Sequence, residues 1–163
     1  CRRESFPRID PAIIVLVTQG DACLLGRNSS WPPRRFSTLA GFVEPGESLE
    51  DAVVREVYEE AQVRLKGIHY VSSQPWPFPS SAMCGFYAEA QDREAGSSEE
   101  VEEARWFTVE SLQRAVLADE VRLSAPVSIA FRLLADWYRK QGGGDLEDLV
   151  RRQRALNVRA PNC

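Results

Sequence analysis

The sequence is poor in histidine, methionine and cysteine, and these shortages exclude several kinds of chemistry. Its 163 residues include one histidine, His69, one methionine and four cysteines. Without His69 no serine or cysteine triad can be built, and because His69 lies in a predicted strand, a surface or core role is favoured for it. The cysteines form no C-x-x-C pair, so neither a disulfide framework nor a complete zinc site is predicted.

The chain also lacks long apolar runs and an excess of positive charge. Its apolar stretches, such as residues 12–17, are far shorter than the roughly 20 residues that span a bilayer, and no charged-then-apolar leader is seen. We therefore expect a cytoplasmic or organellar protein that is neither secreted nor bound in a membrane. The net charge of -4, from 24 acidic and 20 basic residues, disfavours sequence-independent binding of duplex nucleic acid.

The length and hydrophobic content of the chain suffice for one domain of mixed helices and strands. A chain that is 44% hydrophobic at this length can bury one sizeable core. We expect this domain to occupy residues 9–141, between a short segment at 1–8 and a charged tail at 142–163. The tail pattern leaves open a loosely attached helix or a disordered end. Strands are predicted from β-branched and apolar runs at 12–18, 22–26, 37–42, 68–73, 83–88 and 104–107.

Three helices are predicted from apolar periodicity and capping residues. The best defined is Leu49–Ala61, where Ser48 and Asp51 resemble a capping box and an apolar stripe repeats every four residues. A second helix begins near Thr108. A third lies within 126–139, before a run of glycines stops it.

The helix at Leu49–Ala61 carries a dense group of carboxylates. Glu56 and Glu60 are spaced i, i+4, which places them about 5–6 Å apart on one face, and Glu59 lies beside them. Three like charges repel, and we expect Arg55 to neutralise only Glu59, its i+4 partner. Hard divalent cations such as Mg²⁺ or Mn²⁺ prefer oxygen ligands and supply the missing charge. A solvated, glutamate-rich face is the ordinary alternative, so this spacing alone does not identify a metal site.

A longer pattern favours the metal site. Glycine, glutamate, arginine and paired glutamates occur at the offsets of G-x5-E-x7-R-E-U-x-E-E-x-G-U, and the chain resembles this Nudix box at every position but one. The exception is Gln62, where the family has a glycine as left-handed helix cap, so glutamine is expected to cost on the order of 1 kcal/mol. The matching positions are Gly41, Glu47, Arg55, Glu56, Val57, Glu59, Glu60 and Val63.

The resemblance to Nudix hydrolases implies an α+β fold in which a mixed β-sheet is sandwiched between α-helices. It also implies cleavage of a pyrophosphate bond with two or three Mg²⁺ or Mn²⁺ ions per site. The metal ligands that it implies are the carbonyl of Ala40 and the carboxylates of Glu56, Glu59, Glu60 and Glu100. Glu99 and Glu103 are close enough to Glu100 to be confused with it. The three helix glutamates would be catalytic, with Glu59 either a ligand or the group that orients the attacking water. The structural residues that it implies are Gly41, Glu47 and Arg55.

A second segment points to the substrate. Residues 73–80 read S-Q-P-W-P-F-P-S, which predicts a rigid, proline-rich loop whose two aromatic rings form a stiff wall for flat ligands. The segment closely resembles the S-Q-P-W-P-F-P signature of the NADH diphosphatases, and the similarity extends from about Phe6 to Ala130. This resemblance implies hydrolysis of NAD(H) to nicotinamide mononucleotide and AMP. The substrate-binding residues that it implies are Phe6, Ala40, Gly41, Phe42, Gln74, Trp76, Ser81, Glu100 and Ala130.

Other interpretations stay open. Phe42 either projects towards the substrate or packs into the core as the end of a strand. The enzyme could instead remove NAD caps from RNA 5′ ends, or hydrolyse another nucleoside diphosphate derivative such as ADP-ribose. A nucleotide-sensing module without catalysis is disfavoured because the box glutamates remain.

The resemblance also bears on the start of the chain. Cys1 resembles the last of four zinc-ribbon cysteines, so residues 1–8 are expected to be the remnant of an upstream zinc-ribbon-like region. The incomplete cysteine set argues against a structural Zn²⁺. Members of this family form dimers, partly through that region, which leaves a homodimer open for this chain.

Overall fold

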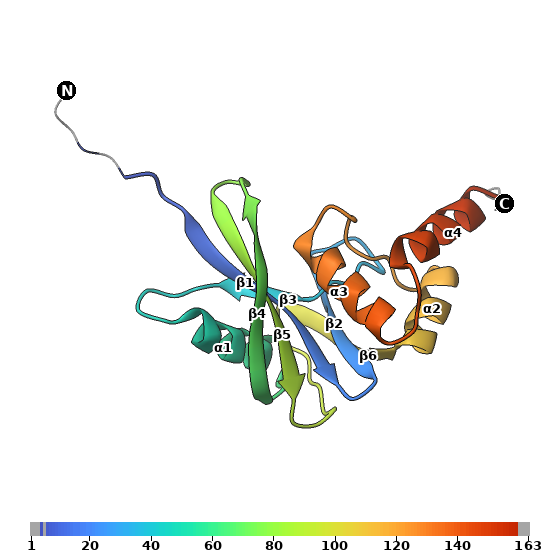
Figure 1. Ribbon diagram of the computed structural model, residues 1–163, viewed down its shortest axis with the longest axis horizontal. Coiled ribbons are helices and arrows are strands. Elements are labelled where there is room, and N and C mark those ends of the chain that lie inside the picture. The colour runs from blue at the N-terminus through green and yellow to red at the C-terminus, as the bar shows by residue number, and fades with distance from the viewer. Residues whose placement is uncertain (1–3, 5, 160–163) are drawn as a thin grey trace.

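A computed structural model of the protein describes residue 4 and residues 6–159 (Figure 1). In this part of the chain six strands form one mixed sheet, and helices lie on both of its faces. The strands are β1 (Asp10–Gln19), β2 (Ala22–Asn28), β3 (Leu39–Phe42), β4 (Leu65–Trp76), β5 (Ser81–Ala90) and β6 (Val101–Thr108). The helices are α1 (Leu49–Ala61), α2 (Val109–Leu117), α3 (Ile129–Lys140) and α4 (Leu146–Arg159).

Strand β1 organises the sheet, whose order is β4-β5-β1-β2-β6. It pairs in parallel with β5 on one side and antiparallel with β2 on the other. Because β2 pairs only with the last residues of β1, the remainder of that edge is free for β3, which pairs antiparallel with it. In this register Gly41 lies opposite Ile13 and Phe42 opposite Ala12. The chain then turns directly into α1, so β3 and α1 meet at one end of the sheet.

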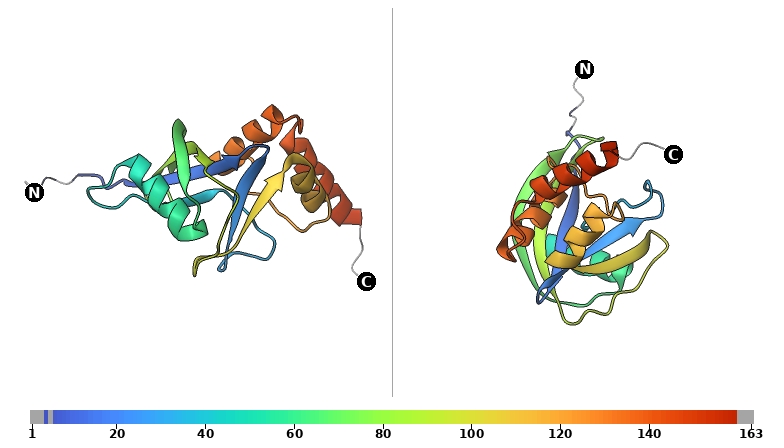
Figure 2. Two further views of the ribbon diagram at one scale, coloured as in Figure 1. Left: turned by 90° about the horizontal axis from the view of Figure 1, so that it is seen from below. Right: turned by 90° about the vertical axis from the view of Figure 1, so that its right-hand side faces the viewer.

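The central strand β1 is buried on both faces of the sheet. Ile14 and Leu16 pack with side chains of α2, α3 and α4. Ile13, Val15 and Val17 point the other way and pack with α1. Figure 2 shows α1 separated by the strands from the group formed by the other three helices. The predicted α+β fold, with a mixed sheet sandwiched between helices, is therefore confirmed.

Helix α1 begins and ends where the sequence predicts. The Ser48 side chain accepts a hydrogen bond from the backbone N–H of Asp51, which satisfies one of the free donors of the first turn. At the other end Gln62 has φ 57° and ψ 22°, and its N–H bonds to the carbonyl of Tyr58. A glutamine thus occupies the left-handed cap position, where glycine is preferred.

Strand β4 is longer than predicted, and the proline-rich segment is not wholly a loop. We expected a strand at 68–73 followed by a loop, but β4 continues to Trp76, and Pro75 pairs with Ala82. β4 is an edge strand of the sheet, and proline, which has no N–H to donate, is tolerated on an edge. His69 is exposed on this strand.

The charged tail contains a helix that packs against the domain. In α4, Leu146, Leu149 and Val150 are buried in the same cluster as α2 and α3. Gln153 is 5% exposed and donates hydrogen bonds to the Val121 carbonyl (2.9 Å) and to Asp119 Oδ1 (3.2 Å). A disordered end is therefore wrong for residues 146–153, because Leu146, Leu149, Val150 and Gln153 are all buried against the domain.

The remaining expectations concern the termini and the membrane. Cys1, on which the expected zinc-ribbon remnant rests, lies outside the described residues. Cys23 and Cys84 are free thiols on separate strands. No helix in the described part of the chain is long and apolar enough to cross a membrane.

Candidate active site

The glutamates of α1 face a cavity of about 760 Å³ formed where β3, α1 and the β4–β5 hairpin meet. Nine of the residues implied as ligands or substrate contacts line it: Ala40, Gly41, Phe42, Glu56, Glu59, Glu60, Trp76, Ser81 and Glu100. Residues outside that set also line it: Ala12, Glu44, Arg55, Phe78, Met83, Ser98 and Glu99. Of the three acidic residues considered near the start of β6, Glu99 and Glu100 line the cavity. Glu103 does not line it, and its Oε1 lies 3.7 Å from Nε of Arg105 on β6.

Gly41 lets the Glu56 carboxylate lie directly over the backbone of β3. A Cβ atom at position 41 would be 1.8 Å from Glu56 Cδ and within 2.3 Å of both carboxylate oxygens. Any side chain there would therefore displace Glu56 from the cavity. The box glycine is needed for this close approach of helix and strand, and Glu56 is positioned by it.

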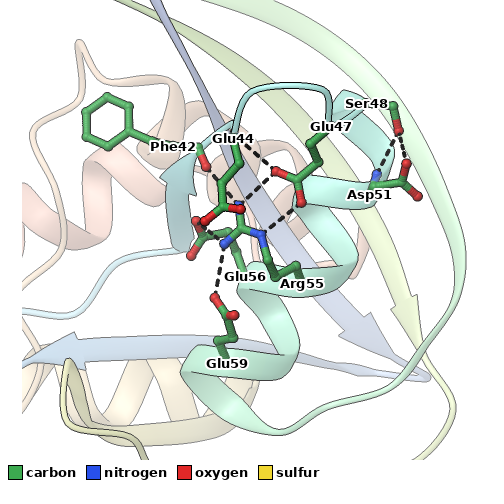
Figure 3. A network of polar contacts seen from close by, with 8 residues as sticks. All are labelled: Phe42, Glu44, Glu47, Ser48, Asp51, Arg55, Glu56 and Glu59. Atoms are coloured by element: carbon green, nitrogen blue, oxygen red, sulfur yellow. Dashed lines mark hydrogen bonds and ion pairs between the residues drawn. The ribbon is translucent and has the colours of Figure 1, made fainter.

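Arg55 ties the loop before α1 to the helix (Figure 3). Its Nε and one terminal nitrogen donate to both oxygens of Glu47, at 2.8 and 2.9 Å, and the same terminal nitrogen donates to the Phe42 carbonyl at 2.9 Å. The other terminal nitrogen bonds to Glu56 at 2.9 Å and Glu59 at 3.0 Å. The prediction that Arg55 neutralises only Glu59 was wrong, because the turn at 43–48 brings Glu47 back onto the helix. These hydrogen bonds hold the pKa of Glu47 at about 2.

Glu60 is the least compensated carboxylate of the group. Its side chain is on the buried side of α1, the residue is 8% exposed, and its Oε2 has no hydrogen-bond partner within the described residues. Burial, together with repulsion from Glu56, raises the pKa of Glu60 to about 8. Burial also raises the pKa of Glu56, even though Arg55 opposes that shift. One arginine is therefore too little positive charge for this end of the cavity.

These residues fit a hard divalent cation. All the candidate donors are oxygens, one of the buried oxygens is without a partner, and the local charge is negative, which is the environment that Mg²⁺ and Mn²⁺ select. Within residues 4 and 6–159, no three acidic, histidine or cysteine side chains already converge as a closed metal cage.

The aromatic residues Phe42, Trp76 and Phe78 also line the cavity and are called its aromatic wall. Trp76 and Phe78 contact each other edge to face, with ring centroids 5.6 Å apart, and are 40% and 73% exposed. Phe42 is 60% exposed at the end of β3, so the alternative in which it packs into the core is wrong. Large aromatic side chains are seldom left this open without a partner, and together these three offer flat surfaces to a ligand.

Three residues expected near the substrate lie elsewhere. Gln74 joins β4 to the start of α3: its Nε2 donates to the Val127 carbonyl at 2.9 Å and its Oε1 accepts from the Ile129 N–H at 2.8 Å. It lines a separate cavity of about 600 Å³ on that side. Ala130 is buried in the first turn of α3, and Phe6 is 87% exposed on the segment before β1. The structure brings none of the three to the cavity of the glutamates.

Comparison with known proteins identifies a family whose domain contains this cavity. Residues 8–127 match the NUDIX domain family model, a span that contains the cavity and every carboxylate in it. The chain belongs to the Nudix family. The arrangement of Gly41, Glu47, Arg55 and the α1 glutamates is thus this chain's Nudix box, and its loop–helix form follows from the Arg55 hydrogen bonds.

The Nudix relatives are similar in sequence but longer. The chain is 52% identical over 151 residues to "NAD-capped RNA hydrolase NudC" of Pseudomonas fluorescens (strain Pf0-1), which covers 92% of this chain and 51% of that protein. It is 56% identical over 108 residues to the protein of the same name from Pseudomonas syringae pv. syringae, covering 66% of this chain and 39% of the other. The chain thus spans about half the length, or less, of these curated relatives.

Solved Nudix structures share the fold at low identity. A NUDIX hydrolase from Nitrosomonas europaea superposes with a TM-score of 0.66 at 22% identity, over 89% of this chain and 78% of that chain. The NUDIX domain of Shewanella oneidensis NrtR, solved with ADP ribose, gives a TM-score of 0.65 at 16% identity, over 83% of this chain and 90% of that chain. At these identities the comparison supports the fold alone.

Proposed function

We propose that this Nudix domain hydrolyses the pyrophosphate bond of NAD(H) and releases nicotinamide mononucleotide and AMP. The observation that carries the proposal is that carboxylates and the aromatic residues Trp76, Phe78 and Phe42 line one and the same cavity. Its volume of about 760 Å³ lies within the range of sites for small organic ligands. A dinucleotide matches this lining, because its flat rings can stack on the aromatic residues and its charged pyrophosphate can lie near the carboxylates.

The aromatic wall binds and orients the substrate. A base or nicotinamide ring stacked on exposed aromatic side chains gains affinity of order 1–3 kcal/mol, by analogy with base stacking on aromatic residues elsewhere. The rings are held on β3 and the β4–β5 hairpin, so a ring bound there has a fixed position relative to α1. Stacking thereby presents the pyrophosphate to the glutamates.

The carboxylate wall would hold two or three Mg²⁺ or Mn²⁺ ions through Glu56, Glu59, Glu60, Glu100 and the Ala40 carbonyl. Such ions, when bound, neutralise charge on phosphate oxygens and lower the pKa of water. Gly41 and Arg55 keep Glu56 in place. The Glu59 side chain is 58% exposed and faces the cavity, which suits it to accept a proton from water that attacks phosphorus. Attack breaks the phosphorus–oxygen bond between the two phosphates, and each product leaves as a monophosphate.

Removal of NAD caps from RNA is a second candidate that one observation favours. The relatives at 52% and 56% identity are named NAD-capped RNA hydrolases. The rim formed by Phe42 and Phe78 is open to solvent, so a polynucleotide that continues from the adenosine has a way out of the cavity. Both candidates use the same bond and the same carboxylates.

A comparison of kcat/KM between candidate substrates tests the proposal. The purified protein is given NADH, ADP-ribose, a nucleoside triphosphate and NAD-capped RNA separately, each with Mg²⁺, and kcat/KM is compared. We expect NADH or the capped RNA to be preferred, and loss of turnover in Glu60→Gln. Glu50→Gln is the matched control, because Glu50 lies on the exposed first turn of the same helix and does not line the cavity. Preferential turnover of ADP-ribose or the triphosphate would refute the substrate assignment.

A further inference from the structure

The residue that departs from the Nudix box, Gln62, contacts a loop of the active site. This acidic loop, residues 91–100, joins β5 to β6, and residues 98–100 line the cavity of the α1 glutamates. A Cβ atom built on Gly96 would have three atoms of the Gln62 side chain as its nearest neighbours outside its own segment, at 3.1–3.2 Å. The Gln62 side chain therefore lies against the loop backbone at Gly96, a contact that a glycine at position 62 could not make.

A backbone hydrogen bond joins the loop and the helix at the same point. The Gly96 N–H donates to the carbonyl of Ala61, the last residue of α1, at 2.7 Å. Further along the loop, the Glu100 carbonyl accepts from the Ser29 N–H at 3.1 Å. These two bonds lie at the ends of the segment whose side chains line the cavity. The position of Glu100 relative to α1 therefore depends on how firmly the loop is held at Gly96.

Charge repulsion works against this arrangement in the metal-free protein. Burial is the main cause of the raised pKa of Glu56 and of Glu60, and the nearby charge of Glu100 adds to it in both. Like charges that lie close together favour movement of the loop away from the helix. Besides the Gly96 hydrogen bond, the Gln62 contact opposes that movement, because several weak dispersion contacts act together.

We propose that Gln62 is a positioning residue that holds the acidic loop against the end of α1, so that Glu100 stays near the metal-binding glutamates. The proposal rests on the metal-dependent function argued above. At φ 57° the backbone of Gln62 favours glycine, which has no Cβ, so the cap gives no reason for a long side chain, whereas the contact with Gly96 does. Because a loop opens locally without unfolding of the whole domain, the cap and the contact act on different equilibria.

Gln62→Gly, which restores the box residue, should change stability and metal binding in opposite directions. The free energy of unfolding in urea should rise, because the left-handed cap is relieved. The Mg²⁺ dissociation constant, measured by titration calorimetry without substrate, should rise about threefold, because the Gln62 contacts that hold the loop are lost. Gln62→Met is the matched control, since it keeps the length of the side chain and should bind Mg²⁺ as wild type does. Unchanged or tighter Mg²⁺ binding in Gln62→Gly, or an equal loss in Gln62→Met, would overturn the proposal.

Hydrogen exchange of the Gly96 amide, measured by NMR in EDTA, needs neither metal nor turnover. This N–H is bonded to the Ala61 carbonyl, so it exchanges when the loop leaves the end of α1. In Gln62→Gly its exchange should be about threefold faster than in wild type or in Gln62→Met. The amide of Val15, a fully buried residue of β1, opens only with the whole fold and should instead exchange more slowly in Gln62→Gly.

The two amides separate a hold on the loop from a general effect on stability. Faster exchange at Gly96 alone supports the proposal. An unchanged or slower rate at Gly96 would contradict it, as would faster exchange at both amides, which would assign Gln62 to the stability of the whole domain. Should the wild type fail to cleave NADH, the proposed function is lost, but the Gly96 exchange rate still judges the contact.

Discussion

Replacement of Glu60 by glutamine should stabilise the metal-free protein while it abolishes function. Burial raises the pKa of Glu60 from 4.5 to about 8. Between these values the folded protein retains a proton that the unfolded chain releases, so the free energy of unfolding decreases as the pH rises from about 4.5 to about 8. At about 1.4 kcal/mol per unit of pKa, the charged carboxylate costs the metal-free fold roughly 3–5 kcal/mol above pH 8.

Glutamine removes this charge at similar volume but leaves a buried amide. If the amide is not fully hydrogen-bonded, it costs about 1–3 kcal/mol. The net gain for Glu60→Gln above pH 8 is then on the order of 2 kcal/mol, which corresponds to a rise in Tm of about 4–8 °C for a domain of this size. Below about pH 4, where Glu60 is protonated in both states, the gain disappears.

Differential scanning calorimetry in EDTA between pH 5 and pH 9 measures this effect, with Glu50→Gln as control. Addition of Mg²⁺ should raise the Tm of the wild type and of Glu50→Gln, because a ligand that binds only the folded state stabilises it. Glu60→Gln should lose most of that rise and all detectable turnover. A variant less stable than wild type in EDTA at pH 9, or one whose Tm difference does not change with pH, would refute the idea that Glu60 is an uncompensated charge.

Three further substitutions test other parts of the site. Phe42→Ala should lower the free energy of unfolding by far less than the roughly 3–5 kcal/mol typical of a buried phenylalanine, because Phe42 is 60% exposed. It should nevertheless raise KM for NADH about fivefold or more, and an unchanged KM would remove Phe42 from the binding wall. Gly41→Ala should abolish turnover in a folded protein, as seen by circular dichroism, since its Cβ would collide with the Glu56 carboxylate; wild-type kcat would show that this contact is dispensable. Gln62→Gly should raise the unfolding free energy by up to about 1 kcal/mol in urea titrations, because it relieves a left-handed cap at φ 57°; a loss of stability would show that the glutamine is favourable there.

Local sequence signals were enough to predict the helix of the box, whereas the layers of the fold were predicted from the resemblance to Nudix hydrolases. Ser48 and the apolar stripe of α1 specify both its start and its buried face, and these signals span only a few residues. The β-branched run of β1 likewise predicts a strand, although its burial on both faces follows from helices distant in sequence. The α1 glutamates could be identified because a helix fixes their relative positions.

Features that depend on distant contacts could not be predicted in the same way. The bidentate contact of Arg55 with Glu47 depends on how the turn at 43–48 folds back, which the i, i+4 rule does not describe. The extension of β4 through Pro75 could be predicted only by knowing that β4 lies at an edge of the sheet. Gln74 belongs to a strongly recognisable segment, but its side chain is used to hold the start of α3.

The most direct test of the central claim is the fate of NADH incubated with the purified protein and Mg²⁺ in ¹⁸O-labelled water. Cleavage of the pyrophosphate bond predicts AMP and reduced nicotinamide mononucleotide in equal amounts. One labelled oxygen should enter a phosphate of one product per turnover, and neither product should form in EDTA or with Glu60→Gln. Release of free nicotinamide or inorganic phosphate, or turnover that survives both EDTA and Glu60→Gln, would contradict the account of a metal-dependent pyrophosphate hydrolase built on the α1 carboxylates.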